Sequence, residues 1–141
     1  MNLYADSSAV LSWMFGEPEG EAVREVLAAA DSVIASDLTL VECDRTILRA
    51  QAIGRISEVQ AADRRGLLVA TAAHWHLLRL DVEVIERARR PFPAEPIRTL
   101  DALHLASALA ARAALPDLAL LSLDERMRTA GRGLGFSLRP I

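Results

Sequence analysis

The chain has 141 residues and a net charge of −3, and 52% of its residues are hydrophobic. This length suits one domain and is too short for two, so we expect a single domain over residues 1–141. All 16 basic residues are arginine, which excludes a Walker-type phosphate loop because that loop needs a lysine, and the negative charge argues against coating nucleic acid by bulk attraction.

Short apolar runs alternate with helical patterns in the first half of the chain. Leu3–Ala5 predicts a strand that ends at Asp6, and a helical pattern follows through Met14. The next predicted elements are an amphipathic helix, a strand and two long helices, over residues 17–30, 32–36, 37–54 and 57–75.

The second half continues the alternation. Residues 78–90 fit either a short strand leading into a helix or one continuous helix, and we favour the first. The next predicted elements are a loop and a helix around Asp101. They are followed by a buried strand over residues 118–123, a helix after Asp124 over residues 124–135 and an edge strand over residues 136–141. Strands separated by helices of this length indicate an α/β fold with a mainly parallel central sheet covered on both faces.

The sequence predicts a cytoplasmic protein with no membrane segment. No uncharged apolar stretch of about 18 residues occurs, and the first ten residues lack the basic start and apolar stretch of a signal peptide. The single cysteine, Cys43, cannot form an internal disulfide, which agrees with a reducing compartment, and three histidines are too few for a zinc cluster.

Three aspartates occupy positions where a helix begins. Asp6 and Asp124 each come after a predicted strand, and the carboxyl ends of parallel strands meet at one edge of a sheet, where ligands bind. Asp101 begins an apolar helix in the stretch RTLDALHLASA, and a buried carboxylate is costly unless it is paired, hydrogen-bonded or bound to a metal. Taken singly, each aspartate also fits a helix cap or a first-turn acid, with Thr99 as the cap before Asp101.

Glu42 adds a fourth acid to this set. It shares a helix stripe with Arg45 and Arg49, so its simpler interpretation is a surface ion pair. Several carboxylates at one edge repel each other unless a divalent cation neutralises them. Oxygen ligands without a Cys or His cluster favour Mg²⁺ or Mn²⁺ over zinc, and such a site suits the cleavage of a phosphodiester by activated water.

Four segments, in this order, resemble PIN-domain ribonucleases, and most closely the VapC-type toxins of bacterial VapBC toxin–antitoxin pairs. They are LYADSSAVLSW, LTLVECDRTI, IRTLDALHLASAL and LLSLDERMRTAGRGLGFSLRP, and the resemblance covers essentially the whole chain. It implies a PIN-like three-layer α/β/α sandwich forming a single PIN domain. The family's four catalytic, metal-binding acids match Asp6, Glu42, Asp101 and Asp124, and the expected substrate contacts are Ser8, Arg45, Ser122 and Arg126.

The resemblance implies a Mg²⁺- or Mn²⁺-dependent endoribonuclease that inhibits growth unless a VapB-like antitoxin binds it, with RNA as substrate and a homodimer as the assembly. Two alternatives stay open at this point. One is a PIN nuclease for RNA processing or DNA flap cleavage without an antitoxin, and the other is a non-catalytic binding module whose acids only cap helices.

Three neighbouring residues leave open questions. Asp117 and Glu125 are further acids near the fourth position, so the assignment of Asp124 is the least secure of the four. His104 lies one turn after Asp101, and because its neighbours are leucine and alanine we expect it to be packed in the core rather than in contact with substrate.

Overall fold

The computed structural model describes all 141 residues and places five strands in one sheet. The strand order is β3-β2-β1-β4-β5 and every neighbouring pair is parallel, so the predicted parallel sheet is confirmed. The strands are β1 (Asn2–Ala5), β2 (Ser32–Ser36), β3 (His76–Leu78), β4 (Ala119–Leu121) and β5 (Ser137–Arg139).

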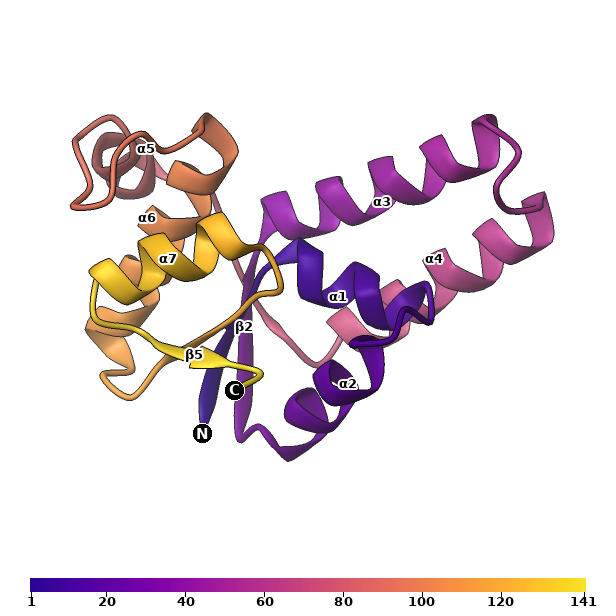
Figure 1. Cartoon of the computed structure of the whole chain (residues 1–141), viewed down its shortest axis with the longest axis horizontal. Helices are drawn as coiled ribbons and strands as arrows, with labels where there is room; N and C mark the ends of the chain where they lie inside the picture. The colour runs from indigo at the N-terminus through magenta and orange to yellow at the C-terminus, as the bar shows by residue number, and fades with distance from the viewer.

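Seven helices connect and follow these strands. Figure 1 shows that α3 and α4 form a long hairpin extending away from the body of the molecule, whereas α5, α6 and α7 gather on the other side. The helices are α1 (Ser7–Met14), α2 (Gly20–Ala29), α3 (Asp37–Ala52), α4 (Glu58–Ala72), α5 (Val82–Ala88), α6 (Thr99–Ala114) and α7 (Glu125–Gly133).

The element boundaries differ from the predicted ones in a few places. The ambiguous segment at residues 78–90 is a short strand followed by a helix, as favoured, but the strand β3 begins earlier, at His76. The helix predicted from Glu17 begins at Gly20, where a side chain would collide with α1 because an added Cβ would lie 2.6 Å from the Ser12 carbonyl oxygen. The close approach of α2 to α1 therefore requires this glycine.

Alternate residues of the central strands pack on opposite faces of the sheet. Leu3 and Ala5 of β1 belong to the core formed with α1, α2, α3 and α4, whereas Tyr4 belongs to the core formed with α6 and α7. This period of two is the geometry of a strand buried on both faces. The sheet is thus covered by helices on both sides, which gives the predicted three layers.

None of the seven helices has both the length and the apolar composition that a membrane crossing requires.

Candidate functional site

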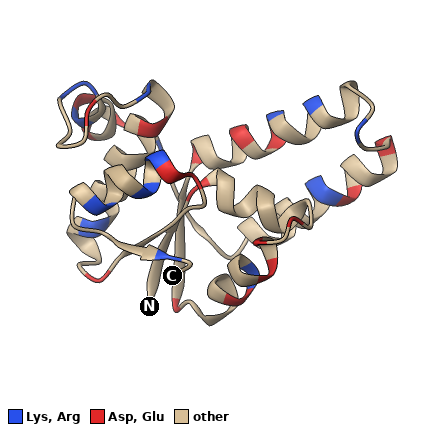
Figure 2. Ribbon diagram, viewed as in Figure 1, with Lys and Arg blue, Asp and Glu red and all other residues tan.

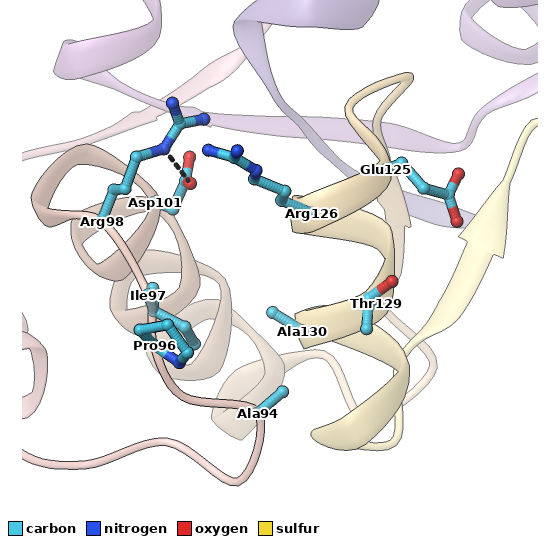
Figure 3. A pocket seen from close by; sticks show the side chains of 9 residues that line it. All are labelled: Ala94, Pro96, Ile97, Arg98, Asp101, Glu125, Arg126, Thr129 and Ala130. Carbon is cyan, nitrogen blue, oxygen red and sulfur yellow. Dashed lines mark ion pairs between the residues drawn. The ribbon is translucent and has the colours of Figure 1, made fainter.

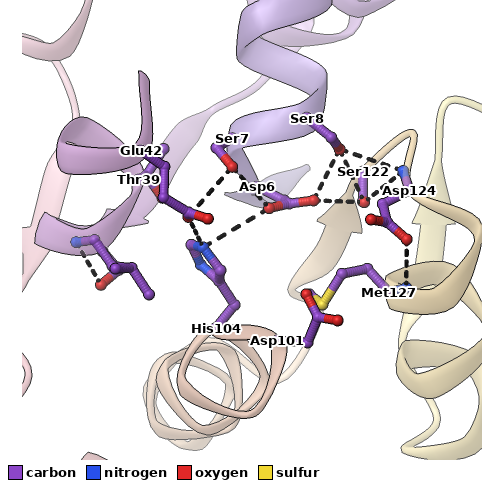
Figure 4. A network of polar contacts seen from close by, with 12 residues as sticks. Asp6, Ser7, Ser8, Thr39, Glu42, Asp101, His104, Ser122, Asp124 and Met127 are labelled. Atoms are coloured by element: carbon purple, nitrogen blue, oxygen red, sulfur yellow. Dashed lines mark hydrogen bonds and ion pairs between the residues drawn. The ribbon is translucent and has the colours of Figure 1, made fainter. Parts of the chain in front are cut away.

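The four predicted acids line one cavity of about 450 Å³ at the carboxyl end of the sheet. Asp6 follows β1 and Asp124 comes after β4, and these two strands are adjacent and parallel, so their ends lie side by side. Glu42 reaches the cavity from the second turn of α3 and Asp101 from the first turn of α6. Figure 4 shows the side chains of Asp6, Glu42, Asp101 and Asp124 around this cavity, and Figure 2 shows acidic positions on α3 and near the start of α7.

Asp6 is held by hydroxyl groups rather than by a helix terminus. It occupies the N-cap position of α1, yet its side chain makes no capping hydrogen bond, so the cap interpretation is wrong for this residue. Its Oδ2 atom instead accepts hydrogen bonds from the Ser8 hydroxyl at 2.8 Å and the Ser122 hydroxyl at 2.7 Å (Figure 4). Asp6 is only 4% exposed, and these two donors stabilise its buried charge.

The two serines also join the ends of β1 and β4. The Ser8 hydroxyl accepts a hydrogen bond from the Leu123 backbone N–H at 3.0 Å and lies 3.3 Å from the Ser122 hydroxyl. The sequence predicts substrate contacts for both serines. Their contacts in the structure are with Asp6 and with the turn after β4, which positions the Asp6 carboxylate at the edge of the cavity.

Glu42 is bound to His104 rather than to an arginine. Its Oε1 atom contacts His104 Nε2 and accepts a hydrogen bond from the Ser7 hydroxyl at 3.3 Å (Figure 4). No ion pair joins Glu42 to Arg45 or Arg49, so the surface ion-pair interpretation is wrong. Arg45 lines a separate depression on the outer side of α3 and does not reach the acidic cavity.

His104 is buried, as expected of a packed residue, but both of its ring nitrogens have polar partners. The Nδ1 atom lies 2.9 Å from the Tyr4 hydroxyl, and Nε2 contacts Glu42 and lies 3.8 Å from Asp6 Oδ1. The ligand atoms of Asp6, Glu42 and His104 all lie within 4.8 Å of one another. The sequence placed His104 in the core but gave no sign that it contacts the acids.

The charges of the cavity are reflected in the pKa values of the groups around it. Burial lowers the pKa of His104, but the hydrogen bond to Glu42 and the negative charges of Asp6 and Glu42 outweigh burial, so the pKa is raised overall. Burial raises the pKa of the Tyr4 phenol, which therefore stays protonated. Burial is also the main reason that the pKa of Asp101 is raised, and the nearby charge of Asp124 adds to it.

Arg98 connects the remaining two acids. Its Nε atom lies 3.5 Å from Asp101 Oδ2, and one terminal nitrogen lies 3.9 Å from Asp124 Oδ2. Arg98, and not Thr99, is the N-cap of α6, and it makes no side-chain cap. The sequence analysis does not identify Arg98. The signal that the sequence does contain is an arginine three residues before an acid at the start of a helix.

Asp124 has two roles at once. Its Oδ1 atom accepts hydrogen bonds from the backbone N–H groups of Arg126 at 2.8 Å and Met127 at 3.3 Å, so the cap interpretation is right for this oxygen. Its Oδ2 atom is the one that faces Arg98. The other acids near this position lie elsewhere: Asp117 bonds Asn2 at the amino end of the sheet, and Glu125 lines the neighbouring cavity.

Comparison with known proteins identifies the family. The PIN domain family profile matches residues 3–133. The chain belongs to the PIN-domain family. This PIN-domain chain is 35% identical over 136 residues to Ribonuclease VapC46 of Mycobacterium tuberculosis, covering 96% of this chain and 95% of that protein, so the resemblance to VapC proteins is confirmed.

Solved structures of VapC proteins share the fold of this PIN domain. The crystal structure of Mycobacterium tuberculosis VapC20, described as a sarcin-ricin loop cleaving toxin, matches with a TM-score of 0.65 and 16% identity over 92% of this chain and 95% of that one. The structure of VapBC2 from Rickettsia felis bound to a promoter DNA fragment matches with a TM-score of 0.65 and 11% identity over 99% and 98%. At these identities the likeness concerns the fold.

The donor set of the cavity in this PIN domain fits a divalent metal ion. Asp6, Glu42, Asp101 and Asp124 supply carboxylate oxygens, the ligands preferred by hard divalent cations. Cys43, the only thiol, is fully buried in the apolar core and offers no soft ligand. Arg98 is the one basic side chain paired with Asp101 and Asp124, at 3.5 and 3.9 Å, so a single positive charge offsets only part of the charge of these two acids.

Proposed function

We propose that this PIN domain is a Mg²⁺- or Mn²⁺-dependent endoribonuclease and the toxin of a type II toxin–antitoxin pair. The observation that carries the proposal is the convergence of four carboxylates, from four separate segments of the chain, on one cavity at the carboxyl end of the sheet. The identity of 35% with a VapC ribonuclease over nearly the whole chain supports RNA as the substrate class.

The proposed catalytic and metal-binding residues are Asp6, Glu42, Asp101 and Asp124. A divalent cation held by these residues would supply the chemistry of such a site, namely polarisation of the phosphodiester, activation of a water molecule and stabilisation of the departing oxygen. The chain's own residues fix the geometry for this chemistry. Because Ser8 and Ser122 both bond Asp6 Oδ2, the Oδ1 atom has only longer contacts, with the Ser7 hydroxyl at 3.5 Å and His104 Nε2 at 3.8 Å.

His104 acts in this proposal as a positioning residue for Glu42. An ionised carboxylate only accepts hydrogen bonds, so His104 Nε2 carries a hydrogen and donates it to Glu42, whether the ring is neutral or charged. A nitrogen that carries a hydrogen cannot bind a metal ion. The Tyr4 hydroxyl at Nδ1 fixes the orientation of the ring, in the way that hydrogen bonds around a metal site commonly orient the ligating groups.

The proposed partners are a VapB-like antitoxin and a second copy of the chain. The α3–α4 hairpin supports an apolar contact surface, because Val41, Val59 and Val69 on these helices are 56%, 70% and 71% exposed. The structure of VapBC2 from Rickettsia felis bound to a promoter DNA fragment shares the fold, which supports a partner of the VapB kind. The proposed location is the cytoplasm, because the proposed substrate is RNA.

The proposal is tested by incubating the purified protein with transfer and ribosomal RNA and mapping the cut sites by sequencing. We expect cleavage with Mg²⁺ or Mn²⁺ and none with EDTA, and slowed growth when the protein is expressed without its antitoxin. Cleavage that continues unchanged in EDTA would contradict the metal mechanism, and normal growth of the expressing strain would contradict the toxin role.

A further inference from the structure

A second cavity adjoins the acidic one. It has a volume of about 530 Å³ and shares Arg98 and Asp101 with the acidic cavity. Figure 3 shows its two walls: the segment before α6 with Pro96 and Ile97 on one side, and the first turns of α7 on the other. A molecule bound in the acidic cavity can therefore continue into this one.

Two guanidinium groups face each other across the entrance of this second cavity. Arg98 comes from the start of α6 and Arg126 from the first turn of α7, and Figure 3 shows both directed toward the same space while Glu125 points away. The Arg126 guanidinium makes no ion pair or hydrogen bond, and Arg98 is 63% exposed with acidic partners at 3.5 and 3.9 Å. Asp101 offsets part of this positive charge through Arg98, but Arg126 has no acidic partner within 4.0 Å, so the entrance still attracts a further anion.

The rest of the lining is mostly small and apolar, formed by Ala94, Pro96, Ile97, Thr129 and Ala130. Two acids, Asp101 and Glu125, also belong to the lining, and the Glu125 side chain points away from the cavity (Figure 3). A cavity of this composition offers a surface for a flat ring or a sugar beside a charged entrance. A phosphate suits a pair of arginines because the planar guanidinium binds two oxygens at once, as it also does with a carboxylate, and phosphate is the anion that an RNA substrate carries.

We infer that this second cavity binds the RNA nucleotide next to the cleaved bond, with its phosphate between Arg98 and Arg126. The inference rests on the proposed ribonuclease function and adds a substrate-binding subsite to it. The phosphate of that nucleotide lies at the cavity entrance, and its sugar or base packs on Pro96 and Ile97. Arg98 is then shared between two kinds of partner, the acids Asp101 and Asp124 on one side and the RNA phosphate on the other.

Because Arg98 is shared in this way, it has opposite effects on the binding of a metal ion and of RNA. Its positive charge beside Asp101 and Asp124 weakens their attraction for a divalent cation, whereas the same charge strengthens the attraction for RNA. Removing the charge should therefore tighten metal binding and loosen RNA binding. General unfolding or loss of the site would weaken both.

The test compares Arg98→Gln and Arg126→Gln with Arg132→Gln, a matched control on the exposed end of the same helix α7. Binding of a fluorescent single-stranded RNA oligonucleotide is measured by anisotropy at several salt concentrations, in an Asp6→Asn background that prevents cleavage. We expect affinity about 10-fold lower for each test variant and a shallower salt dependence, because each removes a charge-assisted phosphate contact. The control should change affinity less than about twofold.

Mn²⁺ binding to the protein without RNA is measured by calorimetry for Arg98→Gln and Arg132→Gln with Asp6 intact. We expect tighter Mn²⁺ binding for Arg98→Gln only.

If Arg98→Gln and Arg126→Gln bind RNA with the affinity and salt dependence of the control, the inferred subsite is wrong. If the wild-type protein fails to cut RNA with Mn²⁺ while RNA binding still depends on the two arginines, the proposed function fails, and the cavity stands as an RNA phosphate site without a cleaved bond beside it.

Discussion

The Ser122 hydroxyl donates a 2.7 Å hydrogen bond to the Asp6 carboxylate across 116 residues of sequence. Ser122 comes directly after β4 and Asp6 directly after β1, so this bond links the carboxyl ends of two neighbouring parallel strands. Both residues are buried, with Ser122 at 0% and Asp6 at 4% exposure. The bond therefore supports a charge that would be costly to bury without donors.

Ser122→Ala should destabilise the protein by about 1.5–3 kcal/mol, because a buried carboxylate loses one of its two strong donors. It should also lower the rate of RNA cleavage by loosening Asp6. Chemical denaturation measures the loss of stability. Ser137→Ala on the exposed part of β5 is the control, and equal stability of the two variants would show that the Ser122 bond contributes nothing.

The sequence predicted the strand ends well and the contacts between helices poorly. Asp6 and Asp124 follow strongly apolar runs, and parallel pairing of those runs is enough to bring the two acids to one edge. The contact of Glu42 with His104 joins α3 to α6 across 62 residues, and it depends on how two helices cross over the sheet. No local pattern carries that information, and the helix stripe of Glu42 pointed instead to Arg45.

His104→Phe should weaken Mn²⁺ binding by about 10- to 100-fold, since it removes the hydrogen bond that orients Glu42 while keeping a ring in the buried space. His104→Gln should recover part of the affinity, because its side-chain amide can still donate to Glu42. Calorimetry with Mn²⁺ measures both variants, and melting curves check that they fold. Equal affinity of the two variants would contradict a positioning role, because a role in packing alone does not need the donor.

Cys43 should be inert in the folded protein. The side chain is 0% exposed, and burial raises the pKa of its thiol from 9.0 to about 12. Iodoacetamide at pH 8.5 should therefore label Cys43 only after unfolding in urea, since the thiolate is the reactive form. Rapid labelling of the native protein, measured by mass spectrometry, would show that the core around α3 opens readily.

The raised pKa of Cys43 also sets the sign of a pH effect on stability. Between pH 9 and pH 12 the unfolded chain releases the thiol proton while the folded chain keeps it, so the folded state binds more protons. The free energy of unfolding should therefore fall as pH rises through this window, by at most about 1.4 kcal/mol per pH unit. Cys43→Ala should show a smaller fall in denaturation measured over the same pH range.

Asp101→Asn should abolish cleavage and leave the fold intact. The pKa of Asp101 is raised by burial and by the charge of Asp124, so the folded protein disfavours the ionised form even with Arg98 beside it. Replacing the carboxylate by a neutral amide of the same shape should then leave stability without metal equal to that of the wild type, or higher. Mg²⁺ should raise the melting temperature of the wild type more than that of the variant, because a ligand stabilises the state that binds it.

A purely structural role of Asp101 predicts the reverse. An acid in the first turn of a helix interacts favourably with the helix dipole, so its neutralisation would cost about 0.3–1 kcal/mol, with no effect of Mg²⁺ and no loss of activity. Thermal melts of both proteins with and without Mg²⁺, together with one RNA cleavage gel, separate these outcomes. Equal Mg²⁺ shifts with full activity in Asp101→Asn would overturn the assignment of Asp101 to the metal site, whereas a shift confined to the wild type would explain why a buried helix begins with an acid.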